Sequence, residues 1–199
     1  MSARTFLFFF VELAMSVQVL TSPALEPVTL AETKAFLQLD SDHEDDLVAG
    51  LIQSAREIAE NKTGIVLITR TLRQTFRRTP ARGVFTLAKS PLVQITQVQY
   101  INAESVATLV DNSTYYVDLG QSRLITLAGF PEPAFVHPAE ALWIDYTAGF
   151  GPATTSVPAS LRMAILLIVR ELFEHRGEGE SALPLRAQSL LAPFAAVRL

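Results

Sequence analysis

The segment of the sequence that comes closest to metal chemistry is an acidic turn at residues 40–46 (DSDHEDD). Alternating carboxylates occur in calcium-binding loops, where the spacing of the ligands is strict. An EF-hand loop that began at Asp40 would need glycine where Asp45 stands and a bidentate glutamate where Leu51 stands. A helix start explains the turn better, because the helix macrodipole favours negative charge in the first turn. We therefore predict no metal site here.

Other catalytic chemistry finds equally little support in the residues. His43, His137 and His175 lie far apart in the sequence, without the i, i+4 spacing of a helical metal pair. The chain has no cysteine, and hence no disulfide and no thiolate nucleophile. There is no G-x-S-x-G or Walker A motif, and residues 149–151 (GFG) do not extend to a dinucleotide fingerprint. We predict that the protein binds no cofactor and is not an enzyme.

The composition indicates either a large core or surface that partners bury. Charged residues make up 18% of the 199 residues, whereas about a quarter is usual in globular proteins. A sizeable core and apolar contact with other subunits both account for this shortfall. The net charge of -4 argues against a protein that binds polyanions in bulk.

The first 25 residues read as an N-terminal extension with three open interpretations. Residues 6–11 (FLFFFV) follow a single basic residue, Arg4, as at the start of a signal peptide. The run is too short to span a bilayer, and Glu12 interrupts it. Translation could instead begin at Met15. In the third interpretation the segment is a true extension whose phenylalanines pack on a neighbouring molecule.

Helical signals flank the middle of the chain. Thr29 and Glu32 form a capping box that predicts a short helix, and a second helix beginning near Asp42 has a single apolar stripe and a glycine stop at Gly64. After Pro158, residues 161–173 are apolar around most of a helical circumference, which predicts burial on several sides.

Between the helices the hydrophobic period changes to that of strands. Residues 66–78 alternate between an apolar and a polar face, and six further short strands are predicted near residues 83–87, 95–101, 107–110, 115–119, 123–127 and 141–147. The spacing suggests an antiparallel meander or a small barrel. The predicted fold class is α+β. It has a small helical core, made of two N-terminal helices and one long apolar C-terminal helix, with an inserted antiparallel β-subdomain.

The domain boundaries follow from these elements. After the N-terminal extension, the helical part is expected at residues 26–65 and continues at 151–178, on either side of a β-rich insertion at 66–150. Residues 179–199 are expected to be a hinge and a C-terminal tail, because the glycines and glutamates near 177–180 favour a flexible connection.

Four short signatures resemble the head-to-tail connector, or adaptor, proteins of long-tailed phages and gene transfer agents. They are residues 26–32 (EPVTLAE), residues 146–151 (YTAGFG), the helix that follows Pro158, and the tail at 190–198 (LLAPFAAVR). The resemblance covers residues 26–199. The β-rich middle is larger than in the mostly helical minimal members, and the N-terminal extension also departs from the pattern.

The resemblance implies a structural virion protein that is assembled in the cytoplasm and located in the neck of a virus-like particle. It would dock under the portal protein as a homo-oligomeric ring of about twelve copies and join the DNA-filled head to a neck, head-closure or tail protein. DNA would pass through the ring without specific binding, and no membrane is involved. The rival hypothesis is a secreted or periplasmic β-rich binding module behind a signal peptide; an unrecognised hydrolase is a poorer third.

Two sets of residues are candidates for contact with partners. The tail residues Leu190, Leu191, Phe194 and Val197 are predicted to bind the portal, unless the tail folds back onto its own core. Contacts between subunits or with a neck protein are predicted for acidic and basic side chains, unless both groups are merely solvated. These side chains are Asp42, Glu44, Asp45, Arg73, Arg77 and Arg78.

Overall fold

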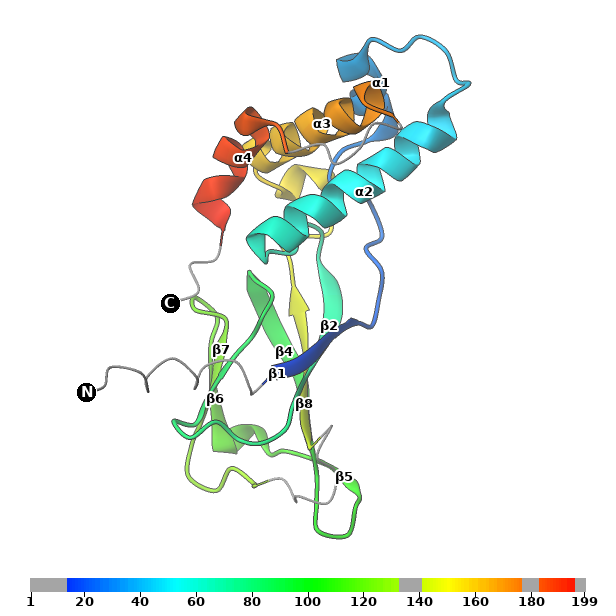
Figure 1. The fold of residues 1–199 in the computed structure, drawn as a ribbon. Helices are drawn as coiled ribbons and strands as arrows, with labels where there is room; N and C mark the ends of the chain where they lie inside the picture. The colour runs from blue at the N-terminus through cyan, green and yellow to red at the C-terminus, as the bar shows by residue number, and fades with distance from the viewer. Residues whose placement is uncertain (1–13, 133–140, 177–182, 196–199) are drawn as a thin grey trace, which may run out of the picture. The chain divides into compact units, whose positions relative to one another are not determined.

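The computed structural model describes residues 14–132, 141–176 and 183–195. These residues contain four α-helices, and their strands pair in antiparallel fashion, which confirms the α+β class (Figure 1). The chain divides into two compact units. The β unit is formed by the described residues of 14–22 and 70–148, and the helical unit by those of 23–69 and 149–199.

The β unit contains two antiparallel sheets. The larger has the order β1-β2-β8-β4-β5, with the strands Ala14–Val19, Arg70–Phe76, Leu142–Ala148, Leu92–Ile101 and Ala107–Leu109. The smaller has the order β3-β7-β6, with the strands Val84–Thr86, Arg123–Thr126 and Tyr115–Asp118. The last strand of the unit in sequence, β8, therefore lies between β2 and β4 (Figure 1).

This strand order corrects the sequence-based expectation of a simple meander or barrel. The six later predicted strands all form, but β8 is inserted between two earlier ones. The first predicted strand begins only at Arg70, and residues 66–69 belong to the helical unit. Strand β1 was not predicted at all. It forms because β2 offers an edge with which residues 14–19 can pair.

Side chains on one face of β2 contribute to the core of the β unit. Leu72 and Phe76 are buried on one face, and the Phe76 ring meets the Phe85 ring of β3 edge-on, with 4.9 Å between centroids. Gln74 lies between them and is fully buried. Its side chain donates to the Thr86 carbonyl and accepts from the Ala88 N–H, which links the two sheets and satisfies the buried amide.

The helical unit confirms the predicted start of its first helix and the glycine stop of its second. Its α-helices are α1 (Leu30–Leu37), α2 (Asp45–Thr63), α3 (Ala159–Glu174) and α4 (Leu185–Leu191). The second helix begins at Asp45, later than predicted, and the Glu32 carboxylate of the predicted capping box pairs with Arg162. The Thr29 hydroxyl accepts the Glu32 N–H at 3.1 Å. Gly64 ends α2 in the left-handed region, and its N–H bonds to the Glu60 carbonyl.

Helix α3 lies at the centre of this unit but differs from the expected long apolar C-terminal helix. It is followed by α4 and a 3-10 turn at Ala192–Phe194, so it is not the last helix. It packs against α1, α2 and α4, which agrees with the predicted burial on several sides. Leu161, Ile165 and Ile168 are buried, whereas Met163 and Arg170, on the remaining strip, are exposed to solvent.

The backbone at Gly149 explains why the signature at residues 146–151 contains a glycine at this position. Its φ of +136° is unfavourable for other residues, and a Cβ would lie 2.5 Å from the Thr69 Cα. This close approach lets the Phe150 N–H bond to the Leu67 carbonyl and the Thr69 N–H bond to the Gly151 carbonyl. Residues 65–69 and 149–151 are thereby joined within the helical unit.

Candidate assembly interfaces

The acidic turn between α1 and α2 is engaged within the helical unit. Lys34 bridges Asp42 and Asp45, the latter at 2.7 Å, and Glu44 pairs with Arg176 at 2.7 Å. The hydrogen bonds from Lys34 lower the pKa of Asp42, and the two carboxylates raise the pKa of Lys34. The Asp42 side chain is still 90% exposed, so a partner can reach it.

Arg73 lies on the outer face of the larger sheet, where it contacts a buried carboxylate. Its Nε and Nη2 atoms donate to the two oxygens of Asp145 at 2.6 and 2.8 Å, and the Gln97 amide donates to the same carboxylate at 2.7 Å. Burial works to raise the pKa of Asp145, but these hydrogen bonds and the Arg73 charge hold it below its ordinary value. The guanidinium also lies 5.6 Å from the centre of the Trp143 ring.

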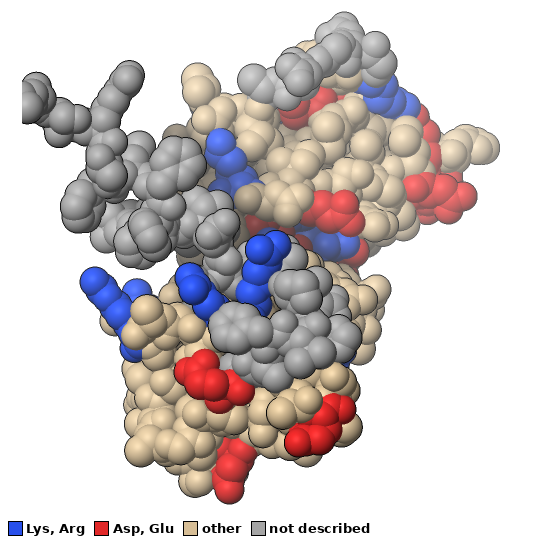
Figure 2. All heavy atoms as spheres, turned by 60° about the horizontal axis from the view of Figure 1, so that its bottom comes forward, with Lys and Arg blue, Asp and Glu red and all other residues tan. Residues whose placement is uncertain are grey.

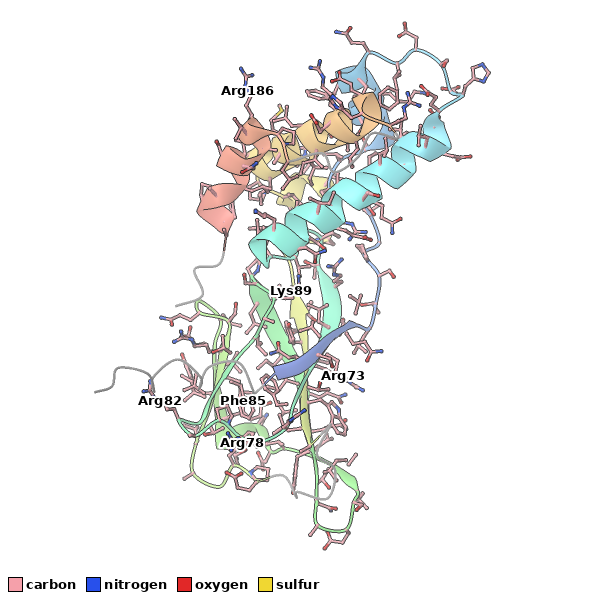
Figure 3. The ribbon with its side chains drawn as sticks, viewed as in Figure 1. Arg73, Arg78, Arg82, Phe85, Lys89 and Arg186 are labelled. Carbon is pink, nitrogen blue, oxygen red and sulfur yellow. The ribbon has the colours of Figure 1, made fainter. Side chains whose placement is uncertain are left out.

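The structure separates Arg73 from the other two predicted arginines. Arg77 and Arg78 follow the end of β2 and are exposed on the connection to β3, as is Arg82 (Figure 3). In the space-filling view, basic and acidic side chains lie apart on the lower part of the visible face and next to one another on its upper part (Figure 2). The pattern that grouped the three arginines could not reveal the Arg73 contact, because Asp145 lies 72 residues away in the sequence.

The described part of the C-terminal tail packs on the helical core. Leu191 is 2% exposed, and Leu190 is partly buried against the same core. The Phe194 ring meets Phe150 edge-on, with 6.4 Å between centroids. Val197 lies outside the described residues. Binding of these side chains to a portal stays a prediction, and for Leu191 it would require α4 to leave its present position.

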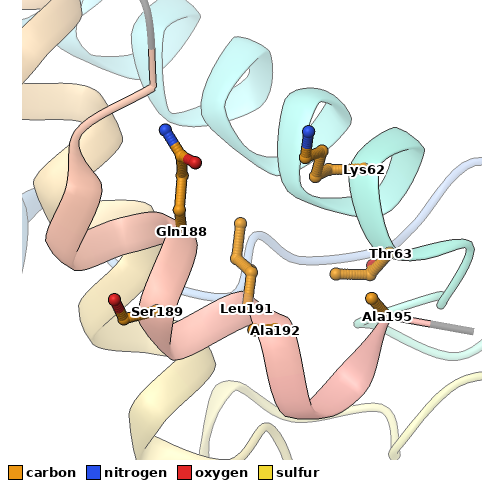
Figure 4. Close-up of a pocket in the computed structure, with 7 residues that line it drawn as sticks. All are labelled: Lys62, Thr63, Gln188, Ser189, Leu191, Ala192 and Ala195. Carbon is orange, nitrogen blue, oxygen red and sulfur yellow. The ribbon is translucent and has the colours of Figure 1, made fainter.

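A groove lies between the C-terminal end of α2 and the tail (Figure 4). Its volume is about 410 Å³, and it is lined by Lys62, Thr63, Gln188, Ser189, Leu191, Ala192 and Ala195. The lining is mainly apolar and contributes a single charged side chain. It offers no nucleophile paired with a base, so its residue types suit packing better than catalysis. Nothing in the sequence pattern indicated this groove.

The described residues contain neither a metal-binding cluster nor a membrane-spanning helix. Within them, no three histidine, aspartate or glutamate side chains gather as they would around a metal ion. Among their helices, none is both long and apolar enough to cross a membrane.

Comparisons with known proteins give the family. The sequence profile of the head completion protein family matches residues 26–181, which is most of the chain. No curated protein sequence is significantly similar. The chain belongs to the head completion protein family and is a structural head-to-tail connector. The resemblance to connectors found in the sequence is thereby confirmed, and no finding favours the secreted binding module.

Solved structures share the fold. One similar chain belongs to the "Neck of empty GTA particle computed with C6 symmetry", with a TM-score of 0.78. Another belongs to the "Virion of native gene transfer agent (GTA) particle", with a TM-score of 0.77, and a third to the "Neck of native GTA particle computed with C12 symmetry", with 0.71. Each is 24% identical, and each comparison covers 93% of this chain and 97% of the other. At 24% identity, the structural similarity to these three chains shows that this chain shares their fold.

Proposed function

We propose that this connector forms a closed ring of twelve copies in the neck of a phage-like particle. The ring docks under the portal and receives a neck or tail protein, without a catalytic role. The observation that supports this most is the overlay with a chain of a neck structure computed with C12 symmetry, which leaves only 3% of that chain unmatched. A ring requires head-to-tail contacts that close, so each copy must present two different surfaces.

The two surfaces we assign to the ring contact are the acidic turn and the connection after β2. The acidic turn carries Asp42 on the helical unit, and the connection carries Arg77 and Arg78 on the β unit. All three side chains are exposed. Each exposed ion pair contributes at most about 1 kcal/mol, so only its repetition around the ring has a large effect. Arg73 contributes less, because Asp145 already engages its guanidinium.

For the portal contact, we propose the tail. Leu190 and Phe194 are only partly buried, and Leu185 at the start of α4 is 80% exposed, so the described tail offers apolar surface in its packed position. Leu191 and Val197 would join the contact if the tail detached from the core. Ordering of an apolar segment on a partner is a common mode of recognition.

Deletion of the gene in the particle-producing host tests the function as a whole. We expect heads that are filled with DNA but carry no tails, as seen by electron microscopy. Imaging of complete particles should show a ring of this protein in the neck. Tailed, infectious or transfer-competent particles without the protein, or a single copy per particle, would contradict the proposal.

Charge reversal tests the ring contact. Arg77→Glu/Arg78→Glu should reduce the yield of complete particles at least tenfold, whereas the matched control Arg123→Glu, an exposed arginine on β7 of the same unit, should not. Circular dichroism of the purified variants checks that both fold. Normal assembly of the double variant would show that these two charges make no contact between copies that assembly needs.

Substitution of the tail residues tests the portal contact. Leu190→Ala/Phe194→Ala should weaken capture by purified portal rings, whereas Ser189→Ala, at an exposed position on the same helix, should leave capture unchanged. Thermal melting of each variant separates loss of a contact from loss of the fold. Unchanged capture by the double variant would contradict the anchor role.

A further inference from the structure

Strand β1 is attached to the β unit almost entirely through its backbone. It pairs with β2 in antiparallel register, and the described side chains that follow its start, at residues 16–20, are all exposed. Val17 and Val19 remain 37% and 48% exposed although they are apolar. Among the described side chains, the hydroxyl of Ser16 bonds to that of Thr75 at 2.8 Å, and directly after the strand the Thr21 hydroxyl accepts the Thr71 N–H at 3.0 Å.

The described core of the β unit contains no side chain from residues 16–19 of this strand. Among the side chains that the structure describes, the buried apolar ones of the unit come from β2, β3, β4, β7, β8 and the adjoining loops. Strand β2 is held from its other side by β8 along its full length, from Arg70 to Phe76. Release of residues 16–19 would therefore expose a sheet edge without removing a described side chain from the core.

The connection that follows β1 is anchored at its far end. Glu26 forms an ion pair with Arg56 of α2 at 2.8 Å, and Val28 is buried in the helical core. Between Val19 and Glu26 the chain contains Pro23 and can extend to about 20–25 Å at about 3.3 Å per residue. Strand β1 is thus a short arm tethered to the helical unit, while the edge it binds belongs to the β unit.

From these observations we propose that β1 is exchanged between neighbouring copies in the ring, so that β1 of one copy pairs with β2 of the next. This inference rests on the proposed ring. A second copy presents the same β2 edge, with the same register and the same Thr75 hydroxyl, so exchange forms every hydrogen bond that it breaks. A ring also holds the neighbouring edge at a high effective concentration, which favours exchange within the assembly over exchange between free molecules.

The exchange gives the ring a property that side-chain contacts alone would not. Each copy would be linked to the next by a row of backbone hydrogen bonds, which do not weaken with salt as surface ion pairs do. A free copy can keep β1 on its own edge, and this protects the edge from indiscriminate pairing before assembly.

Disulfide trapping tests the proposal, because the natural chain contains no cysteine. Ser16→Cys/Thr75→Cys places two thiols at directly paired positions. In the isolated protein, mild oxidation should give an internal disulfide. In complete particles it should instead give covalent multimers that form a ladder up to the full ring on non-reducing gels.

A mixture of single variants provides the decisive control. Particles assembled from Ser16→Cys and Thr75→Cys copies together can form a disulfide only between copies, so covalent dimers are expected. Internal disulfides alone in particles of the double variant would overturn the exchange, as would the absence of any disulfide there when the isolated protein forms one. Particles that contain no copy of the protein, or only one, would instead contradict the proposed ring itself.

Discussion

Both units of this protein bury a carboxylate against an arginine, but they do so in different surroundings. In the helical unit, Arg56 and Glu60 are both enclosed, with side chains 6% and 4% exposed. In the β unit, Asp145 is equally buried, but Arg73 remains 32% exposed on the outer face of the sheet. The Arg56–Glu60 pair is therefore part of a closed core, whereas the Arg73–Asp145 pair lies at a surface that partners can reach.

The partners of the two carboxylates strengthen this contrast. Glu60 also accepts the Leu67 N–H at 3.0 Å, so it joins α2 to the segment that leaves it. Among the described residues, Asp145 receives side-chain donors from Arg73 and Gln97, which lie across the sheet on the neighbouring strands β2 and β4. Substitution of Glu60 should therefore disturb the backbone of the helical unit, whereas substitution of Asp145 should affect only the side chains around it.

The largest effect is expected from Gly149→Ala, which breaks the helical unit where its two segments meet. The added Cβ would lie within 3 Å of the Thr69 and Ile68 backbone, and alanine disfavours the φ of +136°. We expect the free energy of unfolding of the helical unit to fall by about 3 kcal/mol or more. The helical signal in circular dichroism measures this. A variant as stable as the natural chain would show that the backbone has moved to accept the methyl group.

Glu60→Gln should have the next largest effect and tests the enclosed pair. The amide can still accept the Leu67 N–H, but its NH2 group cannot accept from Arg56, which keeps its ion pair with Glu26 and loses the enclosed charge of Glu60. Loss of one charged partner at a buried arginine costs about 2–3 kcal/mol. Chemical denaturation followed by circular dichroism measures the loss, and Gln53→Glu, a change in charge at an exposed position of the same helix, provides the control.

Asp145→Asn should cost less and should be reported by a different signal. Asparagine retains one acceptor for Arg73, and the exposed side of that guanidinium can turn to water, so we expect a loss of about 1.5 kcal/mol. The single tryptophan, Trp143, lies beside Arg73 and reports this unit through its fluorescence. A loss as large as that of Glu60→Gln would remove the distinction between the two pairs.

The pH dependence of stability tests the role of Asp145 in a second way. The folded protein lowers the pKa of Asp145 below its unfolded value of about 3.9, so the contribution of this carboxylate is complete above that pH. It is lost as the pH falls through the lowered folded value. Between pH 5 and 3, the denaturation midpoint seen by Trp143 fluorescence should therefore fall more in the natural chain than in Asp145→Asn. If the midpoints of the two proteins fell in parallel with decreasing pH, Asp145 would not be the group responsible.

The smallest expected effect is a gain. Gly50 is an exposed glycine within α2, and a Cβ there would meet no atom within 4 Å. Gly50→Ala should stabilise the helical unit by about 0.5–1 kcal/mol, because alanine loses less backbone entropy in a helix. A gain seen by circular dichroism without a change in the Trp143 transition would show that the two units unfold separately.

Several of the elements of this protein were predictable because their signals are local. The hydroxyl of Thr29, the left-handed Gly64 and the alternation along β2 act within a few residues, so the sequence predicts the start of α1, the end of α2 and the existence of β2, although β2 is shorter than its pattern. The family could also be predicted, because its signatures are short runs of sequence.

Tertiary structure alone decided the features that depend on distant residues. The insertion of β8 between β2 and β4, the pairing of β1, and the contact of Arg73 with Asp145 all join segments far apart in the chain. The same holds for the burial of Leu191, which follows from how α4 packs on the core. A sequence pattern records which residues can be buried on one face, whereas the partner of that face is fixed only when the whole chain has folded.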